Sequence, residues 1–367
     1  MTRLSVGSAR AEPGQIVTGW FDGVDLPTGS ADRFPVIMAQ GDPEGPVFWV
    51  TASIHGGEHS GLVVAQRLAT PQLVAELHGT LVIIPTLNPA GLRTKERQPY
   101  YHAGDPNRLF PEPNGDSREE NGSANGLEAA YRRLYAAIEG SGASYLLDLH
   151  NAQIGSLPLI FRDPVFYHRR LGKGLTRVQA QALQQRLGEM LDAFGFSVVN
   201  EIVVDSYLRK NLHRSVSGSV LNGLGIPAAT VELGSWMHVD ANVVEACLAG
   251  LRNTLRWAGM LPGNPEPIDG IPLISRAGPV RRCIHPTAPC AGIVHHLARP
   301  GDRVEVGQPL ARITDIFGQP LGGDGLLRSE YEGVVIGWQH GVVRYEGEAI
   351  MIMAVPDDSD LVLPYPY

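Results

Sequence analysis

Between residues 47 and about 260, short apolar runs alternate with longer stretches whose apolar residues recur every three or four positions. The short runs are VFWVTASI, TLVIIPTL, SYLLDLH and IPAATVEL, at residues 47–54, 80–87, 144–150 and 226–233. They predict strands that helices bury on both faces. The longer stretches predict helices at residues 60–77, 127–140, 176–195 and 241–259. This alternation predicts an α/β fold with a mixed, mostly parallel sheet flanked by helices.

The two ends of the chain have a different pattern. Residues 1–46 are rich in Gly, Pro and Asp and contain short apolar pieces, which predict an N-terminal β extension of edge strands or hairpins. LPGNPEPIDGIP, at residues 261–272, has the composition of a linker. Beyond it the helical periodicity ends, and short strands punctuated by Gly predict a smaller all-β domain. We therefore expect a catalytic α/β domain at 1–262 and a β domain at 263–367.

Composition narrows the class of protein. With 367 residues, 43% of them hydrophobic and 19% charged, the chain can bury a large core. A formal net charge of −8 without a Lys/Arg cluster argues against a nucleic-acid partner. No apolar stretch approaches the roughly 18 residues that would span a membrane, and MTRLSVGSAR lacks the apolar run of a secretory signal. We expect a cytoplasmic protein without a membrane partner.

Four polar residues stand at or near the ends of the predicted strands. His55 follows the first apolar run, Asn88 the second, and His150 ends the third, while Glu232 lies near the end of the fourth. In a parallel sheet the carboxyl ends of the strands share one edge, and ligands bind in the crevice beyond that edge. The four side chains are therefore expected to converge there.

The motif HGGE, at residues 55–58, supplies a further candidate ligand. Gly56 and Gly57 are expected to permit a tight backbone turn that brings Glu58 back toward His55. Two His nitrogens and one carboxylate form a common catalytic zinc set that leaves a fourth position for water or substrate. Asp148 stands two residues before His150, where it can orient that histidine.

The ordered set of motifs resembles the succinylglutamate desuccinylase and aspartoacylase family, whose members are relatives of the zinc carboxypeptidases. The motifs are HGGE, NPAG, NRLFP, LDLH and TVELG, spread over roughly residues 47–240. The later stretch GDRVEVGQPLARI also resembles the barrel-like C-terminal domain of family members. One departure is Asp105-Pro106-Asn107-Arg108, where family members often have Asp-Leu-Asn-Arg.

This resemblance implies a metal centre and an acid/base group. It implies one Zn²⁺ per chain, held by His55, Glu58 and His150, with Glu232 as general base or acid. Such a zinc ion acts as a Lewis acid on an amide carbonyl and lowers the pKa of its bound water toward about 7.

The resemblance also implies residues that contact the substrate. Arg97 would face the developing oxyanion, and Asn107 with Arg108 would hold a substrate carboxylate, in which the planar guanidinium suits a bidentate contact. Asn88 is expected to join them in substrate binding.

Each residue also has a simpler interpretation. A single histidine at a strand end is often a core residue bonded to the backbone. Glu58 can cap the helix predicted from residue 60, and Glu232 can pair with an arginine. Arg97 competes with Arg93 and Lys95 in GLRTKERQPYY, and DPNRLFP can be a simple turn.

The pattern GDRVEVGQPL also occurs in lipoyl and biotinyl carrier domains, which need a lysine for cofactor attachment. No lysine follows Lys210, so a carrier function is excluded. The β domain is expected to cap the active site or to mediate contact between subunits of a homo-oligomer.

Together these features predict a zinc-dependent amidohydrolase that removes the acyl group from a small N-acyl amino acid or related carboxylate. Two alternatives remain open at this point. A metallocarboxypeptidase would use the same groups to remove the C-terminal residue of a peptide, and a non-catalytic protein would use them only to bind a metal-dependent ligand.

Overall fold

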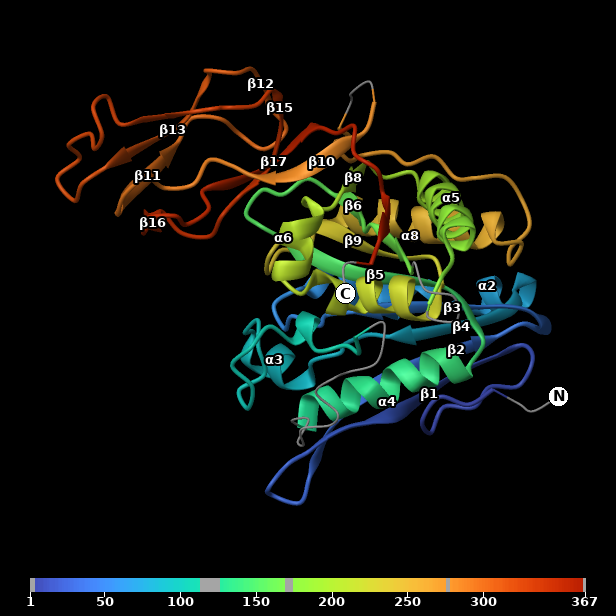
Figure 1. The fold of residues 1–367 in the computed structure, drawn as a ribbon. Helices are drawn as coiled ribbons and strands as arrows, with labels where there is room; N and C mark the ends of the chain where they lie inside the picture. The colour runs from blue at the N-terminus through green and yellow to red at the C-terminus, as the bar shows by residue number, and fades with distance from the viewer. Residues whose placement is uncertain (1–3, 113–125, 169–173, 275–277, 366–367) are drawn as a thin grey trace.

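The computed structural model describes residues 4–112, 126–168, 174–274 and 278–365 (Figure 1). A large mixed sheet flanked by helices forms its centre, and a strand-rich region follows toward the C-terminus. This confirms the predicted α/β class. None of the described helices is long and apolar enough to cross a membrane.

Eight neighbouring strands of the large sheet combine an antiparallel edge with a parallel centre. In spatial order its strands are β1 (Gln15–Asp25), β2 (Ala31–Gln40), β4 (His78–Ile84), β3 (Asp42–Ala52), β5 (Ala143–Ala152), β9 (Ala228–Ser235), β6 (Leu159–Arg162) and β8 (Val198–Asn200). The N-terminal extension forms the β1–β2 hairpin, which pairs antiparallel with β4. Strands β4, β3, β5 and β9 run parallel, so their carboxyl ends meet at one edge.

The parallel strands are apolar on both faces because both faces are covered. Trp49 and Val50 of β3, and Leu146 and Leu147 of β5, are fully buried although neighbouring side chains point to opposite faces. Helices pack on these strands, and in Figure 1 α4 lies in front of β1. The helices with more than one full turn are α1 (His59–Leu68), α2 (Pro71–Glu76), α3 (Pro89–Thr94), α4 (Gly126–Gly140), α5 (Arg177–Phe194), α6 (Val204–Arg209) and α8 (Ala241–Trp257). Shorter helical segments are η1 (Pro106–Arg108), η3 (Leu212–Arg214), α7 (Val216–Ser219) and η4 (Val220–Leu224).

The single helix predicted at residues 60–77 is wrong, because the chain forms two helices there. Helix α1 ends at Leu68, and Thr70 starts α2 by accepting a hydrogen bond from the Leu73 N–H. Pro71 occupies the first position of α2, where its missing N–H costs nothing. Within one continuous helix, the same proline would remove a backbone hydrogen bond and clash with the preceding turn.

The C-terminal strands both extend the large sheet and build a sheet of their own. Strands β10 (Val280–Ile284), β17 (Met351–Pro356), β15 (Gly333–Trp338) and β12 (Arg303–Val304) continue the large sheet beyond β8. Strands β14 (Leu326–Arg328), β13 (Pro309–Thr314), β11 (Gly292–His296) and β16 (Val343–Arg344) form a second sheet. In Figure 1 the labelled strands of this sheet project from one end of the molecule.

The C-terminal region also has a buried cluster of its own, which includes Leu310, Ile313 and Met351. The last strand returns to the α/β part of the molecule, where β18 (Val362–Pro364) pairs with β7 (Val165–Tyr167). A separate cluster supports two units, while the shared sheet joins them. The predicted boundary at residue 262 stays a prediction.

Candidate metal centre and active-site cavity

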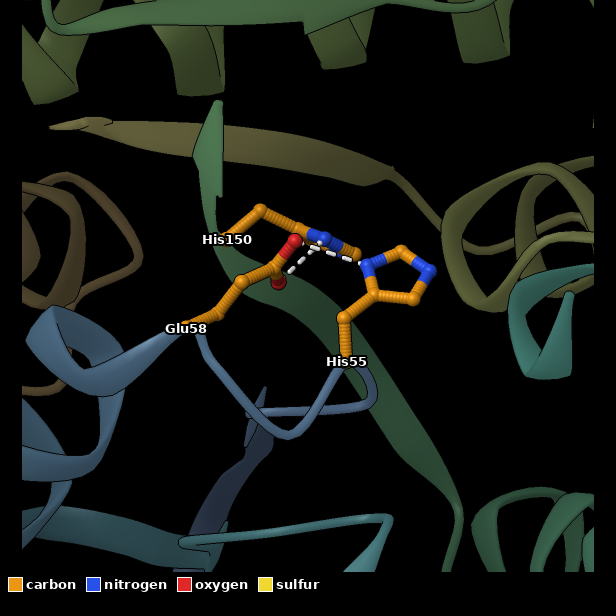
Figure 2. A group of neighbouring side chains, drawn as sticks. All are labelled: His55, Glu58 and His150. Carbon is orange, nitrogen blue, oxygen red and sulfur yellow. Dashed lines mark hydrogen bonds and ion pairs between the residues drawn. The ribbon is translucent and has the colours of Figure 1, made fainter. Parts of the chain in front are cut away.

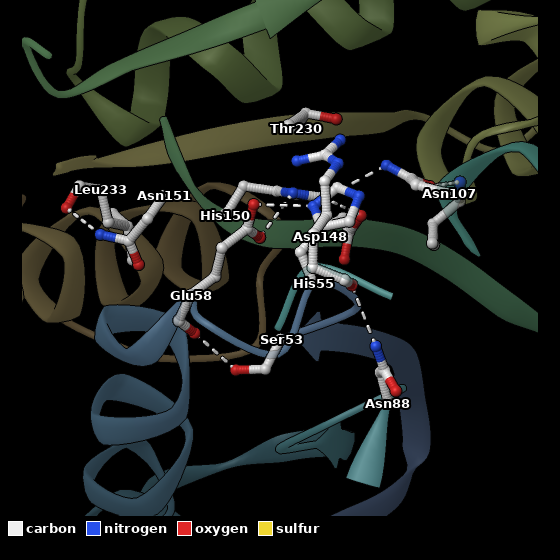
Figure 3. Close-up of polar contacts among 12 residues, drawn as sticks. Ser53, His55, Glu58, Asn88, Asn107, Asp148, His150, Asn151, Thr230 and Leu233 are labelled. Carbon is white, nitrogen blue, oxygen red and sulfur yellow. Dashed lines mark hydrogen bonds and ion pairs between the residues drawn. The ribbon is translucent and has the colours of Figure 1, made fainter. Parts of the chain in front are cut away.

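The loop after β3 brings His55 and Glu58 to the carboxyl edge of the sheet. Ser53, with a φ of +48°, donates a hydrogen bond from Oγ to the Glu58 carbonyl at 2.6 Å, and the Glu58 N–H donates to the His55 carbonyl at 3.0 Å. Figure 3 shows the first of these contacts across the loop. The loop therefore closes on itself within six residues.

Gly56 and Gly57 are needed for a different reason from the one predicted. Neither has a positive φ. A Cβ on Gly56 would lie 1.9 Å from the Gly91 carbonyl carbon in α3, and a Cβ on Gly57 would lie 2.1 Å from the Trp236 ring. The two glycines are required because α3 and the Trp236 indole press against the backbone of the loop.

His55, Glu58 and His150 meet as predicted (Figure 2). His55 Nδ1 lies 2.7 Å from Glu58 Oε1, and His150 Nδ1 lies 2.8 Å from Glu58 Oε2. One ligand atom from each residue lies within 4.8 Å of the other two, and all three residues are at most 3% exposed. A search of the described residues for three or more His, Cys, Asp or Glu side chains that could share one metal ion finds this group.

The charges around these residues fit a divalent cation. Burial acts to raise the pKa of Glu58, but the two imidazoles hold it at about 2. Burial acts to lower the pKa of His150, whereas Glu58 and Asp148 raise it well above its usual value. Each imidazole thus contacts a carboxylate at both ring nitrogens. Two neutral imidazoles and one carboxylate are a donor set that zinc accepts.

Two further carboxylates contact the Nε2 atoms of the two histidines and orient the imidazole rings. Asp148 Oδ2 lies 2.6 Å from His150 Nε2, and its Oδ1 accepts a hydrogen bond from Thr51 Oγ1 at 2.6 Å. Asp105 Oδ1 lies 2.9 Å from His55 Nε2. A carboxylate on Nε2 fixes the ring and leaves Nδ1 as the ligand atom. Asp148 therefore occupies the orienting position that its place in the sequence suggested.

The role of Asp105 was not predicted. It begins the short helix η1 by accepting a hydrogen bond from the Asn107 N–H at 2.9 Å, and it also accepts one from Arg97 Nη2 at 2.9 Å. Burial raises its pKa, but His55 and the neighbouring arginines place that pKa well below the usual range. The sequence Asp-Pro-Asn-Arg could have indicated that Asp105 lies near the site, because it immediately precedes the segment that contains the predicted Asn107 and Arg108.

We expect Asp148→Asn to weaken zinc binding by about 10- to 100-fold, because the amide is a poorer partner for the His150 imidazole. The substitution keeps the size of a fully buried side chain. Competition with a metal chelator measures the affinity, and Glu245→Gln, at an exposed residue paired with Arg67, is the matched control. Equal affinities in the two variants would contradict the orienting role.

Glu232 lies beside the candidate metal ligands, on the strand that neighbours β5. Its backbone pairs with His150 across β5 and β9, and its Oε2 is enclosed without a hydrogen-bond partner among the described residues. Burial raises the pKa of Glu232 to about 7, with Glu58 raising it further and His150 opposing the shift. A carboxyl group of this pKa can both accept and donate a proton near neutral pH.

Asn107 and Arg108 lie on η1 and line the same cavity. Asn107 Nδ2 lies 3.4 Å from His150 Nε2, and its Oδ1 accepts a hydrogen bond from the Val216 N–H at 2.9 Å. The Arg108 guanidinium donates to the backbone carbonyls of Lys210 and Asn107. Its nearest carboxylate oxygen belongs to Asp105, 3.8 Å away.

Among the three basic residues of GLRTKERQPYY, Arg97 lines the cavity. Arg93 instead pairs with Asp32, and Lys95 ends α3 in a left-handed conformation. Asn88 is not among the residues that line the cavity, and its role in substrate binding stays a prediction. Its Oδ1 caps α3 at Gly91, and its Nδ2 donates to the Arg97 carbonyl at 3.2 Å (Figure 3). Both ends of the amide are thus occupied within the chain.

The cavity over the metal site has a volume of about 350 Å³. Its wall includes residues that the sequence did not single out and that come from separate parts of the fold. They are Asp163, Glu201, Arg282, Gln339 and His340. Trp236 also lines it. Arg282 lies on β10, and Gln339 and His340 follow β15, so the C-terminal region closes part of the cavity.

The family model of the succinylglutamate desuccinylase/aspartoacylase catalytic domain matches residues 44–258. None of the curated proteins matches the chain significantly.

Solved structures with the same fold cover nearly the whole chain. One is a succinylglutamate desuccinylase/aspartoacylase from Rhodobacter sphaeroides, with 20% identity, a TM-score of 0.69, and coverage of 98% of this chain and 99% of that one. A second is the product-bound ectoine utilization protein EutE (DoeB) from Ruegeria pomeroyi, with 19% identity, a TM-score of 0.71, and coverage of 95% and 98%. A third is an aspartoacylase family protein from Mesorhizobium loti, with 19% identity, a TM-score of 0.67, and coverage of 95% and 96%.

Proposed function

This chain belongs to the succinylglutamate desuccinylase/aspartoacylase family, and on that premise we propose that it hydrolyses the amide bond of a small N-acyl amino acid in a zinc-dependent reaction. The products are a carboxylic acid and an amine. The observation that carries the proposal is the convergence of two histidines and two carboxylates at one small cavity: His55, Glu58, His150 and Glu232.

His55, Glu58 and His150 would hold one zinc ion, which supplies Lewis acidity toward the amide carbonyl and makes water nucleophilic at neutral pH. Glu232 takes the proton that the attacking water loses. It then delivers this proton to the departing amine nitrogen, so that the C–N bond breaks to give a neutral amine. A pKa of about 7 suits Glu232 to both transfers.

Two arginines contact the substrate, each at a different group. Arg97 is anchored by Asp105 and by the backbone contact from Asn88, and it faces the charge that develops on the carbonyl oxygen. Arg108 and Asn107 bind the carboxylate of the amino acid half. The two backbone carbonyls that accept from Arg108 hold its guanidinium in place before substrate arrives.

Zinc-dependent cleavage is tested by a screen of short N-acyl amino acids, varied in both halves, against peptides of increasing length. The 350 Å³ cavity, partly closed by the C-terminal Arg282, Gln339 and His340, has room for a small molecule rather than a long peptide. We expect turnover of short N-acyl amino acids by protein loaded with one zinc per chain. Preferred cleavage of long peptides would identify a metallocarboxypeptidase, and inactivity toward every short amide would refute the proposal.

We expect Arg108→Lys to raise KM by about tenfold with a smaller change in kcat, because the carboxylate contact already exists in the bound substrate. A lysine ammonium keeps the charge but loses the planar fork. Steady-state kinetics on the best substrate of the screen separates the two constants. Arg67→Lys, at an exposed helix position, is the control. A fall in kcat at constant KM would contradict this assignment.

A further inference from the structure

The pairing of β5 with β9 is irregular directly beside Glu232. His150 pairs with Glu232, but the next pair is Ala152 with Ser235, so one residue of β5 faces two residues of β9. That one residue is Asn151. Such a bulge is rare between parallel strands, and it changes the direction of the side chains next to it. The group that holds the irregular segment therefore also fixes the direction of the Glu232 side chain.

The side chain of Asn151 holds this segment through both ends of its amide. Asn151 is 3% exposed, and its Nδ2 lies 2.9 Å from the Leu233 carbonyl oxygen (Figure 3) and 3.0 Å from that of Ser235. The same nitrogen donates to Ser60 Oγ at 2.9 Å, and Asn151 Oδ1 accepts from the Ser60 N–H at 3.1 Å. Because these contacts use both ends of the amide within the chain, Asn151 acts through other residues rather than on a substrate.

Asn151 joins the three elements that carry the active-site residues. It lies on β5, directly after a candidate metal ligand. Ser60 belongs to the first turn of α1, which begins directly after Glu58. Leu233 directly follows Glu232 on β9. One buried amide therefore links the segments of the metal ligands to the segment of the proposed acid/base group.

We propose that Asn151 is a positioning residue that holds the Glu232 carboxyl group in place beside the metal ligands. This inference rests on the proposed amide hydrolysis. Without the amide, the Leu233 and Ser235 carbonyls lose a donor, and the irregular part of β9 is free to change its pairing. Glu232 then moves relative to the water that it deprotonates. The three candidate ligands keep their own contacts with one another and with Asp148.

Asn151→Asp tests this role with little change in side-chain size. The variant keeps an acceptor for the Ser60 N–H but places an oxygen where the donor faced two carbonyls. We expect kcat to fall by about 10- to 100-fold, because a displacement of about 1 Å at a reacting group can cost about 10²-fold. KM should change by less than about threefold, since no substrate contact is removed. The variant should retain one zinc per chain.

Asn253→Asp is the matched control. Asn253 is also buried, 4% exposed, and its Nδ2 donates to the Glu266 carbonyl at 2.9 Å while its Oδ1 accepts from the Glu266 N–H at 2.7 Å. It is not among the residues that line the cavity. We expect both variants to lose thermal stability and only Asn151→Asp to lose kcat. Asn151→Ser is too short to reach both carbonyls and adds no charge, so it provides a second variant should Asn151→Asp fail to fold.

A double variant separates positioning from general damage to the site. Once Glu232 is replaced by Gln, its position no longer affects proton transfer. Asn151→Asp combined with Glu232→Gln should therefore have a kcat within about threefold of that of Glu232→Gln alone. Two independent defects would instead multiply their losses. Multiplied losses, or an unchanged kcat in Asn151→Asp, would overturn the inference while leaving amide hydrolysis intact.

The crystal structure of zinc-loaded Asn151→Asp tests the inference without turnover. We expect the Glu232 carboxyl group to be displaced while His55, Glu58 and His150 stay in place. A Glu232 side chain in its original position would overturn the inference. Inactivity of the zinc-loaded natural protein toward every short N-acyl amino acid would instead refute the proposed function.

Discussion

Replacement of Glu232 by Gln is expected to lower kcat by about 10²- to 10⁴-fold, the usual contribution of a positioned acid/base group. The amide cannot take a proton from water or deliver one to the leaving amine. Glu232 is suited to both steps because burial raises its pKa to about 7 and its Oε2 is free of hydrogen bonds to described residues. Since the loss concerns the transition state, KM should change much less than kcat.

The Glu232→Gln measurement needs a metal assay beside the kinetics. His55, Glu58 and His150 are unchanged in the variant, so it should retain one zinc per chain. Glu245→Gln provides a surface control with full activity. A Glu232→Gln variant that keeps both its zinc and its turnover would exclude Glu232 as the proton-transfer group. An undiminished ligand affinity in a protein without turnover would favour the metal-dependent binding protein.

Replacement of His150 by Ala is expected to abolish both stoichiometric zinc binding and amide hydrolysis. The change removes one of three ligands and leaves Glu58 and Asp148 without their shared imidazole. Buried charges that lose their partner typically cost about 3–5 kcal/mol of stability. The variant must therefore be shown to be folded, by circular dichroism and thermal unfolding, before its zinc content is interpreted.

His213→Ala is the matched control for His150→Ala. His213 is also buried, 4% exposed, and its Nε2 lies 2.9 Å from a carboxylate oxygen of Glu112. It does not line the cavity. We expect this variant to lose stability but to keep its zinc. If His150→Ala retained one zinc per chain and its activity, the proposed ligand set would be wrong.

The convergence of the candidate metal ligands could be predicted from the sequence because the parallel sheet fixes where its strands end. Each ligand follows or ends a buried apolar run, and parallel pairing brings those ends to one edge. His55 and His150 are almost 100 residues apart, yet their strands β3 and β5 are neighbours. The same reasoning placed Glu232 beside His150 on β9.

Residues on connecting segments were harder to place. Asp105 contacts His55 from a short turn, and no periodicity in the sequence reveals that approach. Asn88 stands at a strand end like the ligands, but its amide caps α3. A polar residue at a strand end can therefore be placed near the sheet edge from the sequence, but its partner cannot, because such side chains also satisfy backbone groups.

The cavity wall beyond the metal depended on long-range packing that the sequence pattern does not encode. Asp163 directly follows β6, Glu201 directly follows β8, and Arg282 lies on β10. These three strands are neighbours only in the folded sheet. The continuation of that sheet into β10 also placed Arg282 in the cavity, although a separate β domain was predicted for its segment. Charge complementarity between such residues can be recognised only after the strand order is known.

The central claim is that His55, Glu58 and His150 hold one zinc ion, and anomalous diffraction at the zinc absorption edge tests it most directly. Crystals of the zinc-loaded protein should show one anomalous peak per chain, bonded to His55 Nδ1, a Glu58 carboxylate oxygen and His150 Nδ1. A peak located elsewhere, or an absence of any peak between these side chains in protein that contains one zinc per chain, would contradict the account.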